Sequence, residues 1–130
     1  MPIVRTAVKS GTSPDLKQKI AMAIHAALAD GIGKPAEELL NLVQDYDPAD
    51  FVYSRTFNGI SRSDSLVMVG ITMRRGRSDA IKSALYAAIA HDLAKDAQIS
   101  PKDVFIFMHK NDYSNWSVGN GNSPAAGIGR

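Results

Sequence analysis

An internal repeat at an interval of about 65 residues limits the folds open to this chain more than any other feature of its sequence. Ser13 and Ser78 are 65 residues apart, and Pro35 and Pro101 are 66 apart. Each half has the pattern of a strand, a serine-capped helix, a turn containing proline and an acidic residue, and a second strand. Two ordinary strand–helix units that match by chance are the alternative, but the shared spacing favours a duplicated unit.

The first half carries signals for one helix between two strands. Residues 3–8 are rich in β-branched side chains, as strands are. Ser13, followed by proline and aspartate, is typical of a helix start, and Gly31 and Gly33 are typical of its end. Residues 39–43 form an apolar run and predict the second strand. The predicted helix places apolar residues on one face at Leu16, Ile20, Ala23, Ile24, Ala27 and Leu28.

The second half repeats these signals. Residues 66–73 are almost continuously apolar and predict a strand, and residues 104–108 predict another. Ser78 between them is expected to cap a helix. The apolar positions of that helix are Ile81, Leu85, Ala88, Ile89 and Leu93.

These halves predict one α/β (α+β) domain over residues 1–130. The halves are expected at about 1–47 and 66–110. Since a helix between two strands favours parallel pairing, we predict tandem β-α-β units in a four-stranded sheet, with both helices on one face. Residues 48–65 join the halves and contain an Asn-Gly pair that favours a short hairpin. The glycine-rich residues 111–130 are expected to form a tail that reaches a neighbouring subunit.

Composition excludes several classes of function. The chain has no cysteine, which rules out disulfides, thiolate zinc sites and cysteine nucleophiles. Its 15 Lys and Arg against 13 Asp and Glu are too balanced to predict nucleic-acid binding. Neither a membrane span nor a secretory signal is found, so we expect a cytoplasmic protein. Nucleotide motifs are absent, and His25, His91 and His109 lack metal-ligand spacing, so no cofactor or metal is predicted.

Pro2 is a candidate catalytic residue because it follows the initiator methionine and leads directly into a core strand. Removal of Met1, which is usual before a small residue, would leave a rigid secondary amine. Burial or nearby cations would lower the pKa of that amine and make it a usable base. Many proteins begin Met-Pro without such a role, so the motif needs support from other residues.

A basic run supplies that support where the third predicted strand meets the second helix. Arg74, Arg75 and Arg77 surround a glycine there. Ligands of α/β folds commonly bind beyond strand carboxyl ends, and guanidinium groups bind carboxylates in a bidentate way. A solvated basic turn would have the same sequence, so the combination with Pro2 is what favours a binding site.

At this point the sequence resembles the tautomerase superfamily, and within it the branch of malonate semialdehyde decarboxylase. The likeness rests on the Met-Pro start, the two β-α-β halves and the Arg-x-Gly-Arg-Ser motif before the second helix. Residues 62–64, 100–104 and 115–121 extend it over nearly the whole chain. The resemblance implies a tautomerase-like fold, a homotrimer and an amino-terminal proline that acts as catalyst in each subunit.

The resemblance also implies roles for individual residues. It makes Pro2 the catalyst and assigns Glu38 to the aspartate that assists the proline. Arg77 matches one of two arginines that bind the substrate carboxylate, and either Arg74 or Arg75 is the other, with Arg74 favoured. Trp116 matches a tryptophan of the site wall.

Some features resemble cis-3-chloroacrylic acid dehalogenase instead. The Arg-x-x-Arg spacing is one, and His25 matches a histidine of its site, although a half-buried packing role fits His25 equally well. Phe107 stands where that enzyme has tyrosine, and Ser117 where it has its water-activating glutamate. Dehalogenation is therefore disfavoured.

The implied function is proton transfer by Pro2 on a small carboxylate-bearing oxo acid. The reaction would be keto–enol tautomerisation, decarboxylation of a 3-oxo acid such as malonate semialdehyde, or both. A hydratase of the dehalogenase type is the alternative. A catalytically silent trimeric binding protein is another, and it would be favoured if Met1 were retained and Pro2 remained an amide.

Overall fold

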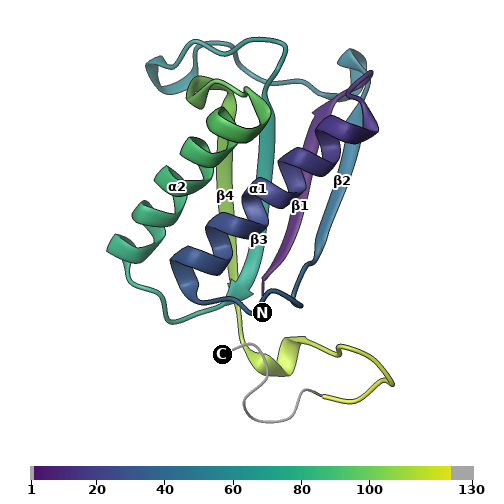
Figure 1. The fold of residues 1–130 in the computed structure, drawn as a ribbon, viewed down its shortest axis with the longest axis vertical. Coiled ribbons are helices and arrows are strands. Elements are labelled where there is room, and N and C mark those ends of the chain that lie inside the picture. The colour runs from purple at the N-terminus through teal and green to yellow at the C-terminus, as the bar shows by residue number, and fades with distance from the viewer. Residues whose placement is uncertain (1, 124–130) are drawn as a thin grey trace.

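The structure is a computed structural model that describes residues 2–123, and Met1 and residues 124–130 lie outside the described part. A four-stranded sheet in the order β2-β1-β3-β4 forms one layer. Helices α1 and α2 pack together over one of its faces (Figure 1). The bounds are β1 Ile3–Lys9, α1 Pro14–Ile32, β2 Asn41–Tyr46, β3 Val67–Arg74, α2 Asp79–Ala97 and β4 Val104–Asn111.

Strand pairing confirms the predicted fold class. Within each half the two strands are parallel, β1 with β2 and β3 with β4. The halves join through antiparallel pairing of β1 with β3. Because each parallel pair is connected through its own helix, the sheet consists of two β-α-β units.

The helices reproduce the 65-residue repeat, since both are 19 residues long and start at equivalent positions. The hydroxyl oxygen of Ser13 accepts a hydrogen bond from the Leu16 N–H at 3.1 Å. Ser78 accepts one from the Ile81 N–H at 3.2 Å. Each serine satisfies a donor that the first helical turn leaves free, so a local signal fixes where each helix begins.

The core lies between the helices and one face of the sheet. Strand residues alternate between this face and the open face, as the pleat requires. Leu85, Ile89 and Leu93 of α2 are buried as predicted, whereas the prediction for Ile81 is wrong, because its side chain is 44% exposed. The buried set also includes Val4, Val8, Ile20, Ile24, Leu28, Val69 and Ile71.

Two other local predictions need correction. The second strand covers Asn41–Tyr46 rather than residues 39–43. As an edge strand with one face toward solvent, β2 accepts polar residues that an apolar pattern does not detect. The predicted hairpin is also wrong, because the described residues 48–65 contain no strand and the Asn-Gly pair lies in a 3₁₀ turn over Phe57–Gly59.

The antiparallel joint between the halves brings distant segments to one end of the sheet, which we call the Pro2 end. Ile3 pairs with Thr72, so Pro2 lies next to the last residues of β3. The Val4 N–H donates to the Leu40 carbonyl at 2.9 Å, so the start of β2 also lies at the Pro2 end. The opposite end, which we call the connector end, holds the last residues of β1 and β2 together with residues 48–65 (Figure 1).

No helix in the described range 2–123 has an apolar stretch that would let it cross a bilayer.

Candidate functional site at the Pro2 end

Pro2 is buried at the entrance to β1. In the antiparallel register Ile3 faces Thr72, so Pro2 stands opposite Met73 and one residue from Arg74. The register therefore brings the sequence-predicted proline and the start of the basic run to the same end of the sheet, although 72 positions separate Pro2 from Arg74 in the chain. Removal of Met1, on which the chemistry of Pro2 depends, lies outside the described residues.

Arg74 ends β3 with its side chain on the open face of the sheet, since its neighbour Met73 is buried on the helix face. Its guanidinium lies over the ring of Tyr113, 4.9 Å from the ring centroid, and its Nη1 donates to the Tyr113 hydroxyl. Its Nε is buried and has no partner among the described residues. Because an unpaired buried donor is costly, this N–H is available to an anion.

The two neighbouring arginines differ in their surroundings. Arg75 is 60% exposed, and its Nε donates to Asp112 at 2.7 Å. Arg77 follows Gly76, whose φ of 117° turns the chain toward α2, and is half-buried. Arg75 is thus paired with a surface carboxylate, whereas Arg74 keeps a buried N–H that has no partner among the described residues.

A buried lysine that the sequence analysis missed lies in the same part of the fold. Lys34 is 5% exposed, and its Nζ lies 2.7 Å from Nδ1 of His25, which is 9% exposed. Burial lowers the pKa of Lys34, while the charge of Glu38 opposes that shift. The available signal in the sequence was the position of this lysine, directly before Pro35 at the end of an apolar helix. Because lysine is rarely fully buried without a partner, its burial there requires a partner such as His25.

The contact with Lys34 also defines the state of His25. Burial lowers the pKa of His25, the charge of Lys34 lowers it further, and a backbone hydrogen bond with Ala36 opposes both. A charged Lys34 can donate only to an unprotonated Nδ1, so His25 is neutral in this arrangement. His25 therefore holds Lys34 in place, in the loop that carries Glu38.

This pair predicts a loss of stability in acid. The folded-state pKa of His25 lies below its ordinary value of 6.5, so the unfolded chain takes up this proton first as pH falls. The stability that neutral His25 contributes to the folded protein is fully present above pH 6.5 and is lost as pH falls below 6.5. Urea unfolding at about pH 7.5 and about pH 5 should show a smaller acid loss in His25→Gln than in wild type. His91→Gln, at a 74% exposed histidine, should keep the full loss; equal losses in all three proteins would contradict the prediction.

Trp116 is fixed beside the arginines by the end of β4. Its indole Nε1–H donates to the Asn111 side chain at 2.8 Å, and Asn111 pairs with Arg74 across the sheet. A 3₁₀ turn over Tyr113–Asn115, closed by a capping box with Asp112, turns the chain so that the half-buried indole lies there. The sequence predicts Trp116 as a site residue, whereas no pattern in it indicated Tyr113.

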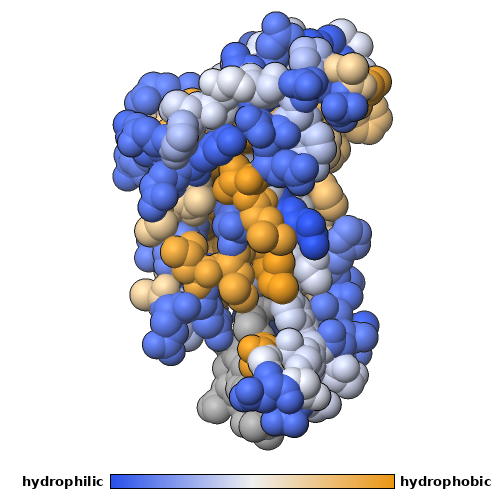
Figure 2. All heavy atoms as spheres, turned by 90° about the vertical axis from the view of Figure 1, so that its right-hand side faces the viewer, coloured by the Kyte–Doolittle hydropathy of each residue, from blue (hydrophilic) through white to orange (hydrophobic). Residues whose placement is uncertain are grey.

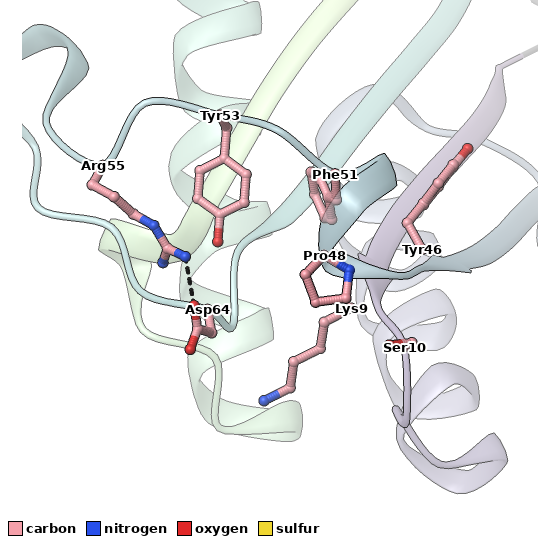
Figure 3. Close-up of a pocket in the computed structure, with 8 residues that line it drawn as sticks. All are labelled: Lys9, Ser10, Tyr46, Pro48, Phe51, Tyr53, Arg55 and Asp64. Atoms are coloured by element: carbon pink, nitrogen blue, oxygen red, sulfur yellow. Dashed lines mark hydrogen bonds and ion pairs between the residues drawn. The ribbon is translucent and has the colours of Figure 1, made fainter.

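A distinct cavity of about 440 Å³ lies at the connector end. Figure 3 shows the residues that line it: Lys9, Ser10, Tyr46, Pro48, Phe51, Tyr53, Arg55 and Asp64. None of them was predicted as a site residue. Within residues 2–123 no three His, Asp or Glu side chains gather as a metal site would require.

Comparison with known proteins identifies the relatives of the chain. Residues 38–119 match Tautomerase_2, described as "Tautomerase enzyme". The probable tautomerase YusQ of Bacillus subtilis is 30% identical over 121 residues, which cover 93% of this chain and 95% of that protein. The crystal structure of a malonate semialdehyde decarboxylase is 28% identical, covers 92% of each chain and has a TM-score of 0.86. A fused 4-OT described as a symmetric trimer has the same fold at 22% identity, 93% and 94% coverage and a TM-score of 0.76.

Proposed function

Because the chain belongs to the Tautomerase_2 family of tautomerase enzymes, we propose that it transfers protons on small oxo acids with the amino-terminal nitrogen of Pro2. The observation that carries this proposal is the placement of a buried Pro2 at the same end of the sheet as Arg74, whose buried Nε lacks a partner among the described residues. A base beside an anion-binding group is the arrangement that enolisation of a carboxylate-bearing substrate needs.

The proposed tautomerisation moves one proton within the substrate. The Pro2 nitrogen takes the hydroxyl proton of an enol such as phenylenolpyruvate and delivers it to the neighbouring carbon, giving the keto acid. Arg74 and Arg77 bind the carboxylate throughout. In the decarboxylation of malonate semialdehyde, a protonated Pro2 would instead donate to the aldehyde oxygen while the carbon–carbon bond to the carboxylate breaks and carbon dioxide leaves.

The other residues of the site act around this transfer. Glu38 is half-buried just before β2, the strand that runs parallel to β1, and is proposed to balance the charge of protonated Pro2. His25 acts indirectly, by holding Lys34. Trp116 supplies an apolar wall against which the body of the substrate packs.

We also propose a homotrimer, since a structural relative is described as one. The exposed apolar surface supports assembly, because Leu42 and Phe107 on the open face of the sheet are 56% and 41% exposed. Figure 2 shows apolar side chains gathered over the middle of the side that carries β2. Patches of this kind commonly mark protein–protein interfaces.

Labelling of the amine tests the proposed function. A related malonate semialdehyde decarboxylase is inhibited by 3-bromopropiolate, an electron-poor alkyne to which an amine can add. We expect the protein to turn over phenylenolpyruvate or malonate semialdehyde, and we expect this reagent to abolish turnover while adding one adduct to the amino-terminal peptide. Absence of both activities in protein whose mass shows Pro2 at the amino terminus would favour a silent binding protein.

A further inference from the structure

The cavity at the connector end is the repeat counterpart of the Pro2 end. Its lining residues and the residues around Arg74 are related by the same interval of 65. The equivalent pairs are Lys9 with Arg74, Ser10 with Arg75, Tyr46 with Asn111, Pro48 with Tyr113, and Phe51 with Trp116.

The backbone around the two ends is equivalent as well. Lys9 is the last residue of β1, as Arg74 is of β3. Each is followed by a glycine with positive φ, 85° at Gly11 and 117° at Gly76. A 3₁₀ turn follows each second strand, at Pro48–Asp50 and at Tyr113–Asn115. The duplication therefore places a cation and an aromatic side chain at the connector end in the same way as at the Pro2 end.

The two ends differ most in the group that stands at the Pro2 position. The repeat counterpart of Pro2 is Val67, which lies inside the chain and has an amide in place of an amine. An amide nitrogen is not a base near neutral pH, so the connector end cannot carry out the proposed proton transfer. A cation, Lys9, and an aromatic ring, Phe51, remain as groups that can bind a ligand.

Those groups suit an anion with a planar apolar body. Figure 3 shows Lys9 reaching the cavity below Tyr53, while Arg55 is held by Asp64 at 2.5 Å. Lys9 forms no ion pair with any described residue, so its ammonium is available to a ligand. Phe51 links the aromatic wall, with its ring centroid 5.9 Å from that of Tyr46 and 5.1 Å from that of Tyr53. The volume of about 440 Å³ falls within the range of small-molecule sites.

We propose that the connector end is a second, non-catalytic binding site for small aromatic carboxylates. Lys9 binds the carboxylate, and the face formed by Tyr46, Phe51 and Tyr53 packs against the ring. Binding here does not depend on Met1 removal or on the chemistry of Pro2, so the proposal stands or falls separately from the proposed function.

Titration of the full chain with benzoate, followed by ¹H–¹⁵N NMR, tests this site. We expect saturable shifts of the Ser10, Phe51 and Tyr53 amides, separate from any shift of the Trp116 indole, which reports on the Pro2 end. Lys9→Gln should weaken the connector-end binding by about tenfold or more through loss of the charge. Lys19→Gln, a control at another exposed lysine, should bind as wild type.

A second variant guards against an indirect effect of the lysine substitution. Phe51→Leu keeps an apolar side chain but removes the ring, and it should also weaken benzoate binding while phenylenolpyruvate turnover stays at the wild-type value. Shifts confined to the Pro2 end, shifts that do not saturate, or equal affinity in wild type and Lys9→Gln would each overturn the proposal.

Discussion

Replacing Pro2 with alanine is expected to lower kcat/KM for phenylenolpyruvate by about 10²-fold or more. Alanine leaves a primary amine on a freely rotating chain end, whereas proline holds a secondary amine rigidly at the buried start of β1. Proton transfer requires the nitrogen within hydrogen-bond reach of the substrate, so loss of rigidity and basicity both act on the rate. Initial rates across pH, on protein whose amino terminus is verified by intact mass, measure the effect.

A matched variant separates the amine from the ring. One glycine inserted between Met1 and Pro2 keeps the proline but converts its nitrogen into an amide. We expect this extended protein to lose activity at least as completely as Pro2→Ala, with an unchanged thermal unfolding midpoint. Full activity in the extended protein would show that the proline nitrogen does no chemistry and would leave Arg74 and Arg77 as parts of a binding site.

The fold could be predicted because its strongest signals are local and occur twice. Ser13 and Ser78 mark the helix starts through bonds to N–H groups three residues away, so their spacing in the sequence becomes the spacing of the helices. The pairing of β1 with β3 is not encoded in this local way. It follows from joining two β-α-β units whose apolar faces must be buried together.

The part of the site that escaped prediction depends on contacts between distant segments. Lys34 can be buried because Nδ1 of His25 accepts a hydrogen bond from its ammonium group, and no spacing rule links a helix residue to the loop after the helix in this way. Likewise the choice between Arg74 and Arg75 follows from Tyr113 and Asp112, which lie nearly 40 positions away. A run of three arginines indicates positive charge, but only packing shows which of them keeps a buried N–H without a partner among the described residues.

Replacing Arg74 with glutamine is expected to lower kcat/KM for phenylenolpyruvate by about 10²-fold, mostly through a higher KM. The guanidinium is a partly buried cation at the Pro2 end, and its Nε lacks a partner among the described residues. A substrate carboxylate that accepts from this donor would gain a charge-assisted hydrogen bond in a site shielded from water. Glutamine keeps much of the length and polarity of the side chain but removes the charge.

Arg75→Gln supplies the control, because it removes the same charge from the neighbouring residue. The Arg75 side chain is 60% exposed and paired with Asp112. Its kcat/KM should stay within about threefold of wild type, since an exposed ion pair contributes little. Tyr113→Phe should fall between the two, because the stacked ring remains while the hydroxyl that accepts from Arg74 is lost. If Arg75→Gln proved as damaging as Arg74→Gln, the carboxylate would be bound by the field of the whole basic turn, and the unpaired Nε of Arg74 would not be its specific partner.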